Sequence, residues 1–420
     1  MNGANIKSVT ALEVLDSRGN PTVKVTVTTE GGQIGEAMVP SGASTGQYEA
    51  YELRDGDSFR YRGKGVLKAV SHVEGSLFSA VAGLDVRNQE QIDSLLCAVD
   101  GTENKENMGA NAILGLSMAV ARAGAAVKGE TLWEHLSGEK RYRMPVPMMN
   151  ILNGGAHSDN PLDIQEFMIV PVGADSFSEA LRMGAEIYHT LGRELKKQGF
   201  SVGVGDEGGF APAVPDTESA LSFIQNAINN AGYSLAEVKI SLDIAASEWW
   251  QETGYHMPKS KKEYTADTWR EELKRLQGIY GFLSVEDPFG DTDMAGFRAF
   301  TADVGENCLV VGDDLFVTNT KRLEMGIRHG AANAILIKPN QIGTVSETLR
   351  VIDLARKNGY AYIISHRSGD TEDSFIADLA VATAAPLIKT GAPCRSERVA
   401  KYNRLLAIER TLGKSVAFGL

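Results

Sequence analysis

The chain has 420 residues, of which 43% are hydrophobic and 23% are charged, as is typical of a globular protein. This length exceeds what one ordinary core organises, so we expect two domains, one of them large. The formal net charge of −12 argues against a nucleic-acid partner and against binding to an anionic membrane surface. An anionic ligand would therefore need positive charge gathered locally, as side chains or as bound metal.

The three cysteines, Cys97, Cys308 and Cys394, are odd in number and form no CxxC pattern, so neither a disulfide framework nor a zinc site is expected. The first residues lack the basic and apolar segments of a secretory signal. The most apolar long stretch, residues 110–127, contains polar residues and glycines, which favours a packed helix over a membrane span. We expect a cytoplasmic protein.

The first third of the chain predicts a small α+β domain. Residues 21–39 alternate apolar and polar side chains around Gly31-Gly32, which predicts a β-hairpin. Helical patterns follow to about residue 136, and the charged segment 137–143 separates them from a new apolar strand. We therefore predict an N-terminal domain over residues 1–139 and a second domain over residues 140–420.

The second domain repeats one unit, a short apolar run closed by a polar or charged residue and followed by a helical pattern. The closing residues are Asp243, Glu286 with Asp287, Asp313 with Asp314, Lys338, His366 with Arg367, and Lys389. Strands that alternate with helices predict a parallel sheet buried on both faces. With the runs at 147–152 and 165–171 the strands number eight, which predicts an α/β fold of the closed β/α-barrel type, with the active site at the carboxyl ends of the strands.

Two sets of strand-closing residues suggest chemistry. The carboxylates of Asp243, Glu286 and Asp313 close successive strands, so they should converge, and oxygen ligands without Cys or His suit Mg²⁺. The alternative is that they are solvated charges at the starts of loops.

Lys338 and Lys389 close later strands, and a lysine beside a second cation has its protonated form disfavoured, as a general base requires. The alternative is an ion pair across the barrel mouth.

Other candidates lie in loops. Arg367 and Ser368 offer a bidentate cation and a hydroxyl for phosphate or carboxylate, whereas His366 has either a ligand-binding or a structural role. Residues 203–212 match G-x-G-x-x-G, but the following proline interrupts a helix and the two carboxylates would repel a pyrophosphate. Glu207 is instead a candidate acid.

Two further loops are rich in small residues. Residues 40–46, "PSGASTG", lack the lysine–threonine ending of a phosphate-binding P-loop and predict a mobile lid. The glycine-containing stretch 153–160 and the segment 163–167 supply His157, Gln165 and Glu166, each with a ligand-binding or a structural role.

Taken together, these motifs resemble the enolase family along nearly the whole chain. The matching segments are 16–22, 39–46, 52–57, 109–115, 165–171, 205–212, 242–248, 285–288, 311–320, 340–344, 365–373 and 395–403. The resemblance implies a lyase that reversibly dehydrates 2-phosphoglycerate to phosphoenolpyruvate, with an enolase-type barrel, two Mg²⁺ per active site and a homodimeric or octameric assembly with Arg18 at the subunit contact.

The resemblance also implies a role for each matching residue. Lys338 would remove the C2 proton, and Glu207 would protonate the departing C3 hydroxyl. Ser44 would close over the site with the second Mg²⁺. The first Mg²⁺ would bind Asp243, Glu286 and Asp313, and the remaining substrate-binding residues would be His157, Gln165, Glu166, His366, Arg367, Ser368 and Lys389.

Some residues depart from the family's usual pattern, notably Pro386-Leu387 close to Lys389 and Gln47-Tyr48 beyond the lid. They leave open a related enzyme of phosphonate metabolism, which would form carboxyphosphonoenolpyruvate with the same base, acid and metals. A scaffold that keeps the fold without catalysis is a third hypothesis, against which the intact base, acid and metal carboxylates argue.

Overall fold

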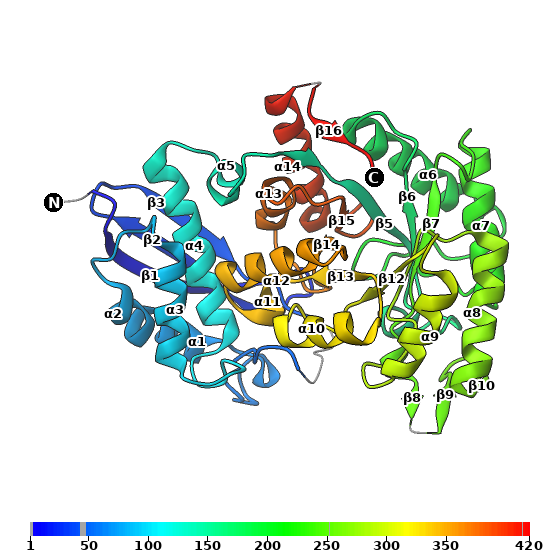
Figure 1. Cartoon of the computed structure of the whole chain (residues 1–420), viewed down its shortest axis with the longest axis horizontal. Coiled ribbons are helices and arrows are strands. Elements are labelled where there is room, and N and C mark those ends of the chain that lie inside the picture. Colours follow the sequence, from blue (N-terminus) through cyan, green and yellow to red (C-terminus); the bar gives the residue numbers. More distant parts are fainter. Residues whose placement is uncertain (1–2, 43–47, 252, 414) are drawn as a thin grey trace.

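A computed structural model describes residues 3–42, 48–251, 253–413 and 415–420. Figure 1 shows two parts side by side, an N-terminal part that ends with α5 (Leu132–Leu136) and a barrel that begins with β5 (Val146–Asn153). The boundary that we predict at residues 139/140 falls in the segment between these two elements.

The N-terminal part is a three-stranded antiparallel sheet covered by helices. Its strands are β1 (Ile6–Leu15), β2 (Pro21–Thr29) and β3 (Ile34–Met38), in the order β1-β2-β3, and its other helices are α1 (Leu67–His72), α2 (Phe78–Val81), α3 (Gln89–Asp100) and α4 (Ala110–Lys128). The hairpin predicted over residues 21–39 is confirmed as β2 and β3. The sequence analysis missed β1, because a register irregularity near Ile6 and exposed Leu12 and Leu15 obscure its alternation.

Helix α4 is long and apolar enough, by length and composition, to cross a membrane, but 83% of its most apolar window is buried inside the structure. It ends at Gly129, whose φ of 67° suits a glycine better than any other residue. A Cβ at Gly35 of β3 would lie 2.1 Å from the Ala119 carbonyl oxygen, so β3 and α4 pack in direct backbone contact. The helix lies between this sheet and the barrel helix α12 (Val345–Lys357) (Figure 1).

The predicted α/β barrel is confirmed as a closed sheet in the order β11-β12-β13-β14-β15-β5-β6-β7. The remaining strands are β6 (Glu166–Val170), β7 (Lys239–Asp243), β11 (Ser284–Glu286), β12 (Leu309–Gly312), β13 (Ala334–Ile337), β14 (Ala361–Ser365) and β15 (Leu387–Lys389). Alternate strand residues enclose a separate apolar cluster that includes Met148, Met168, Val311, Leu336, Ile363 and Leu387. This cluster closes the barrel below its polar mouth.

The helices α6 (Phe177–Lys197), α7 (Thr217–Asn230), α8 (Ala266–Tyr280), α9 (Met294–Val304), α10 (Thr320–His329), α12, α13 (Phe375–Ala382) and α14 (Ser396–Leu412) belong to the barrel domain. Capping side chains define several of their starts. Ser176 and Thr344 accept hydrogen bonds from backbone N–H groups in the first turns of α6 and α12. The short helix α11 (Pro339–Ile342) follows Lys338 directly, and two-residue β4 (Arg143–Met144) pairs with β16 (Ala417–Phe418). A small sheet of β8 (Trp250–Gln251), β9 (Gly254–His256) and β10 (Glu263–Tyr264) extends the loop after β7.

The expectation of a wholly parallel barrel is wrong at β6, which pairs antiparallel with both β5 and β7. The segment between β5 and β6, residues 154–165, holds one short 3₁₀ turn, η3 (Gly155–His157), and no crossover helix. Parallel strands need a long crossover connection, so the chain turns back and pairs antiparallel. As a result the first residue of β6, not its last, lies at the barrel mouth.

The two parts are joined by a partly buried ion pair, in which the side chains of Arg122 and Asp373 are 22% and 7% exposed. Arg122 of α4 donates two hydrogen bonds, of 2.6 and 2.7 Å, to the carboxylate of Asp373, which also accepts the Met38 N–H at 2.9 Å. Burial raises the pKa of Asp373, but Arg122 outweighs burial and holds that pKa below its ordinary value.

Replacing Asp373 by Asn tests this contact. A carboxylate whose pKa is depressed by folding contributes stability above its unfolded pKa, about 4, and loses it as pH falls through the folded-state value. We expect Asp373→Asn to lower the free energy of unfolding by about 3 kcal/mol at neutral pH, and by progressively less as pH falls below about 4. Denaturant unfolding at a series of pH values measures this difference. Asp353→Asn, which removes a half-exposed partner of Arg356, is the control and should cost under about 0.5 kcal/mol. A deficit for Asp373→Asn that does not change with pH would contradict the assignment.

Candidate active site

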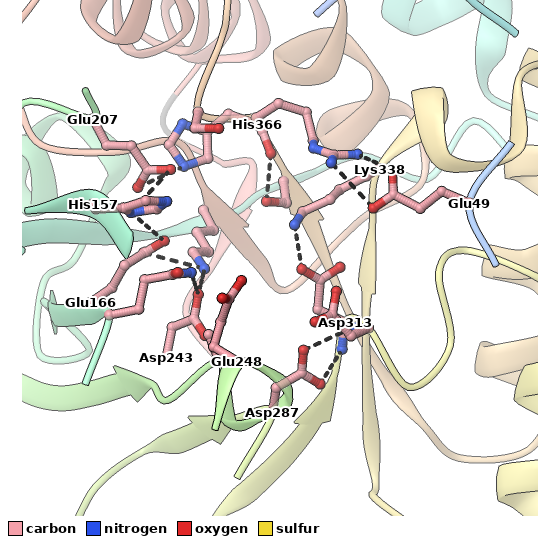
Figure 2. A pocket seen from close by; sticks show the side chains of 17 residues that line it. Glu49, His157, Glu166, Glu207, Asp243, Glu248, Asp287, Asp313, Lys338 and His366 are labelled. Carbon is pink, nitrogen blue, oxygen red and sulfur yellow. Dashed lines mark hydrogen bonds and ion pairs between the residues drawn. The ribbon is translucent and has the colours of Figure 1, made fainter. Parts of the chain in front are cut away.

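Side chains from five strand ends meet at the barrel mouth. Asp243 ends β7, Glu286 ends β11 and Lys389 ends β15, each of them buried. Glu166 begins β6 and lies opposite Asp243 in the strand register. Because β6 runs antiparallel, its starting residue reaches the same edge as the residues that end their strands. Asp313 follows β12 directly and completes the set (Figure 2).

The ammonium of Lys389 lies among three carboxylates. Its Nζ is 2.9 Å from Asp243 Oδ2, 2.9 and 3.0 Å from the two oxygens of Glu286, and 3.2 Å from Glu166 Oε2. Burial lowers the pKa of Lys389, but these carboxylates outweigh burial and raise that pKa well above its ordinary value. Burial, and then the charge of Asp243, raises the pKa of Glu286 well above its ordinary value. The carboxylates therefore repel one another and depend on a cation between them.

Lys338 follows β13 and forms an ion pair with Asp313, which also accepts a hydrogen bond of 2.9 Å from Gln341 Nε2. Burial lowers the pKa of Lys338, but Asp313 outweighs burial and raises it. Lys338 therefore has an ion pair, as the alternative interpretation expected, although its partner follows the adjacent strand β12 and does not lie across the mouth. The expectation of a disfavoured ammonium does not hold while Asp313 stays paired with Lys338.

Glu207 lies on the other side of the mouth, between two histidines. Its Oε2 accepts a hydrogen bond of 3.0 Å from Asn150 Nδ2 and lies 3.5 Å from His366 Nε2, while its Oε1 lies 4.0 Å from His157 Nδ1. Burial raises the pKa of Glu207, but His366 and His157 outweigh burial and hold that pKa well below its ordinary value.

Glu166 has the opposite shift. Its Oε1 lies 3.8 Å from His157 Nδ1, and burial, followed by the charge of Glu207, raises its pKa well above the ordinary value. Two carboxyl groups whose pKa values are pushed apart mark an acid–base site. The opposite shifts favour the protonated form of Glu166 over that of Glu207, although the sequence resemblance assigned the acid role to Glu207.

The guanidinium of Arg367 is buried and held by Glu49 of the N-terminal part. Nη1 lies 2.9 Å from Glu49 Oε2 and Nη2 lies 3.2 Å from Glu49 Oε1, and Nη1 also donates to Asn340 Oδ1 at 3.2 Å. The sequence analysis missed Glu49, although it follows the predicted lid, residues 40–46, by only three positions. This contact brings Glu49, which follows the predicted lid in the sequence, to the arginine predicted to bind an anion.

The structure brings most of the predicted site residues into one cavity. Those that line it are His157, Gln165, Glu166, Glu207, Asp243, Asp313, Lys338, His366, Arg367, Ser368 and Lys389. Gln165 Nε2 lies 3.4 Å from Asp243 Oδ2. Glu286 lies beneath the lining, bound to Lys389, and Ser44 lies outside the described residues.

The charge of the cavity fits a bound divalent cation. Among the residues that the structure describes, eight carboxyl groups line it, against two lysines and one arginine, so an anionic ligand would be repelled without added positive charge. Hard oxygen ligands lie at adjacent strand ends, on Asp243, Glu286 and Asp313. In this structure these carboxylates are paired with the ammoniums of Lys338 and Lys389.

In the part of the chain that the structure describes, two other groups of ligand atoms converge within 4.8 Å: His157 with Glu166 and Glu207, and Asp287 with Asp313 and Asp314. The sequence analysis assigned no role to two members of the second group, Asp287 and Asp314. The carboxylate of Asp287 accepts the backbone N–H groups of Asp313 and Asp314 at 2.9 and 2.8 Å, so it fixes the loop that presents Asp313. Burial, followed by the charge of Asp313, raises the pKa of Asp314 to about 7.

The loop that carries His157 is held by Lys259. The Nζ of Lys259 donates to the carbonyl oxygens of Gly155, at 2.7 Å, and Ser158, and Asp163 accepts the backbone N–H of Lys259 at 2.8 Å. The sequence analysis missed this lysine because it begins the charged run "KSKK", which resembles a solvated surface segment.

Removing this ammonium should loosen the loop. We expect Lys259→Met to speed hydrogen–deuterium exchange of the amides in residues 154–160 by about tenfold, because a hydrogen bond to a charged group contributes about 1.5–3 kcal/mol. Mass spectrometry of the exchanged peptides measures this. Lys261→Met, which changes an exposed lysine of the same run, is the matched control. Equal exchange in the two variants would contradict the role of Lys259.

Comparison with known families agrees with this geometry. The family model described as the enolase N-terminal domain matches residues 6–136, and the one described as the enolase C-terminal TIM barrel domain matches residues 141–419. The two matches cover nearly the whole chain. The match to the barrel domain of this metal-dependent family includes all the described residues that line the cavity except Glu49. The chain therefore belongs to the enolase family.

Proposed function

We propose that the protein is a phosphopyruvate hydratase that catalyses the reversible, Mg²⁺-dependent dehydration of 2-phosphoglycerate to phosphoenolpyruvate. The observation that carries the proposal is the position of Lys338 and Glu207 on opposite sides of the pocket (Figure 2). A base and a separate acid on two sides of one ligand are what the removal of a proton and of a hydroxyl from neighbouring carbons requires.

In the proposed first step, the Nζ of Lys338 takes the C2 proton of the substrate. The electron pair left behind spreads into the adjacent carboxylate, which becomes a dianionic enediolate. Lys389 stabilises this negative charge from the end of β15, where it is buried and its ammonium is held by three carboxylates. When bound by Asp243, Glu286 and Asp313, Mg²⁺ would supply positive charge at the substrate carboxylate. With Asp313 engaged in this way, Lys338 would lose the partner that holds its proton.

In the second step, the C2–C3 double bond forms as the C3 hydroxyl leaves with a proton from the acid. In the free site the pKa shifts favour a proton on Glu166 over one on Glu207, and His157 lies between the two carboxyl groups. An arriving anionic substrate raises the pKa of Glu207 by like-charge repulsion and favours the protonated carboxyl that the acid role needs. The proposal therefore assigns Glu166 and His157 to the supply of this proton.

The phosphate is proposed to bind Arg367 and Ser368. Both are buried beside the cavity, and in the free protein the Glu49 carboxylate forms a two-point contact with Arg367 that a phosphate could also make. Binding would then exchange one anion for another at the same guanidinium. Closure by Ser44 with a second Mg²⁺ remains a prediction, because Ser44 lies outside the described residues.

The alternative phosphonate substrate gains little support. Leu387 belongs to the apolar cluster inside the barrel, and the Pro386 carbonyl accepts the Val146 N–H at 2.9 Å, so both serve the sheet. Neither is among the described residues that line the cavity. Tyr48 packs under the guanidinium of Arg322, 3.8 Å from the ring centroid. The departures therefore concern packing at described positions, not ligand contacts.

The homodimeric or octameric assembly and the cytoplasmic location remain predictions. Arg18, proposed to lie at the subunit contact, donates to the carbonyl oxygens of Ser41 and Gly42 within the chain. Leu12 and Leu15 of β1 are exposed and available to a second subunit.

Turnover tests the proposed reaction. We expect the protein to form phosphoenolpyruvate from 2-phosphoglycerate, followed by its ultraviolet absorbance, with Mg²⁺ present and not with excess chelator. Lys338→Ala should lower kcat by roughly 10²–10⁴-fold, the usual contribution of a general base. Lys261→Ala, at an exposed position, is the control for the loss of a lysine. No turnover by a folded protein that binds Mg²⁺ would overturn the proposal and direct attention to phosphonate substrates.

A further inference from the structure

Arg398 of α14 is fully buried directly behind the acid side of the pocket. Its Nη1 donates to the Arg367 carbonyl oxygen and lies 2.6 Å from Nδ1 of His366. Its Nη2 donates to the carbonyl oxygens of Asp206, at 3.1 Å, and Ser368. The four N–H bonds of the two terminal nitrogens are therefore committed, one of them to a histidine ring.

This contact decides which nitrogen of His366 carries the proton. A guanidinium donates hydrogen bonds and cannot accept them, so Nδ1 of His366 must accept. Burial lowers the pKa of His366 to about 4, and Arg398 adds to this effect although Glu207 opposes it. The ring is therefore neutral at pH 7, and its single proton lies on Nε2.

The protonated nitrogen faces the cavity. Nε2 of His366 is buried, lies 3.5 Å from Glu207 Oε2, and has no hydrogen-bond partner among the residues that the structure describes. His366 itself lines the cavity beside Glu207 (Figure 2). A buried N–H without a partner is costly, so its place in the pocket points to a ligand acceptor.

We propose that Arg398 is a positioning residue that fixes His366 as the Nε2–H tautomer, so that the ring presents a donor to Glu207 and to the oxygen that departs from C3. With the other tautomer, the Nε2 lone pair would face the Glu207 carboxylate and repel it, and no donor would reach the departing oxygen. The identity of that oxygen rests on the proposed function, but the tautomer does not. The tautomer can therefore be tested whether or not 2-phosphoglycerate is the substrate.

A purely structural role for Arg398 predicts something different. Lys401, one turn further along α14, is also buried and donates to Asp370 and to the Thr371 carbonyl oxygen. It holds the same loop without touching the His366 ring. If Arg398 only supports the loop, substitutions of Arg398 and of Lys401 should have the same effect on the His366 tautomer. If Arg398 fixes the tautomer, only substitutions of Arg398 should change it.

The test is nitrogen NMR of the full-length protein labelled with ¹⁵N in its seven histidines, with His366→Asn used to assign the signals. The proposal predicts that in the wild type His366 Nε2 resonates as a protonated ring nitrogen and Nδ1 as an unprotonated one. A wild-type protein with Nδ1 protonated overturns the proposal without any variant, so a folding failure cannot hide the result.

Variants then connect the tautomer to turnover, measured with the substrate that the wild type converts. Arg398→Met should release the Nδ1–H tautomer and lower kcat by roughly 10²-fold with KM changed much less. Arg398→Lys, which keeps an obligate donor, should keep the Nε2–H signal and recover part of kcat. Lys401→Met is the matched control and should keep the wild-type tautomer. An unchanged tautomer in folded Arg398→Met would overturn the proposal. Equal losses of kcat in Arg398→Lys and Arg398→Met would also overturn it.

Discussion

The Lys389 ammonium, surrounded by the carboxylates of Asp243, Glu286 and Glu166, is the interaction on which the barrel mouth depends. Three buried carboxylates at neighbouring strand ends would repel one another and could not all stay ionised without a cation. Lys389 offsets part of this repulsion from the end of β15. The rest of the negative charge is what prepares the site for a divalent cation and, through it, for an anionic substrate.

The same cluster separates two chemical sides. On one side the Lys338 amine is paired with Asp313, and on the other Glu207 lies between His157 and His366. The opposite pKa shifts of Glu166 and Glu207 have different causes: burial and then the charge of Glu207 raise the pKa of Glu166, whereas at Glu207 the two histidines outweigh burial. Binding a metal and a substrate would redistribute these charges. In the substrate-free site, Asp313 therefore favours the ammonium form of Lys338, and the pKa shifts favour a proton on Glu166 over one on Glu207.

Much of this site could be predicted from sequence, because parallel strands place their last residues at one edge. Asp243, Glu286 and Lys389 follow from that rule alone. The loop motifs already indicated Glu207 and Arg367 as candidates, and the resemblance to the enolase family gave each a specific role. The rule misplaces β6, whose direction depends on the short connection after β5. Glu49, Lys259 and Arg398 could not be predicted, because their partners lie far away in the chain. Protonation states were also beyond reach, since they depend on burial and on charges gathered from several strands.

The measurement that tests the account most directly is exchange of the C2 proton of 2-phosphoglycerate with D₂O. The account places the base, Lys338, and the acid, Glu207, on separate sides of Lys389 and its carboxylate partners. It predicts that Glu207→Gln, in the presence of Mg²⁺, still exchanges the C2 proton but forms no phosphoenolpyruvate, whereas Lys338→Ala does neither. Exchange by Lys338→Ala, or loss of exchange in a folded, Mg²⁺-binding Glu207→Gln, would contradict the division of roles.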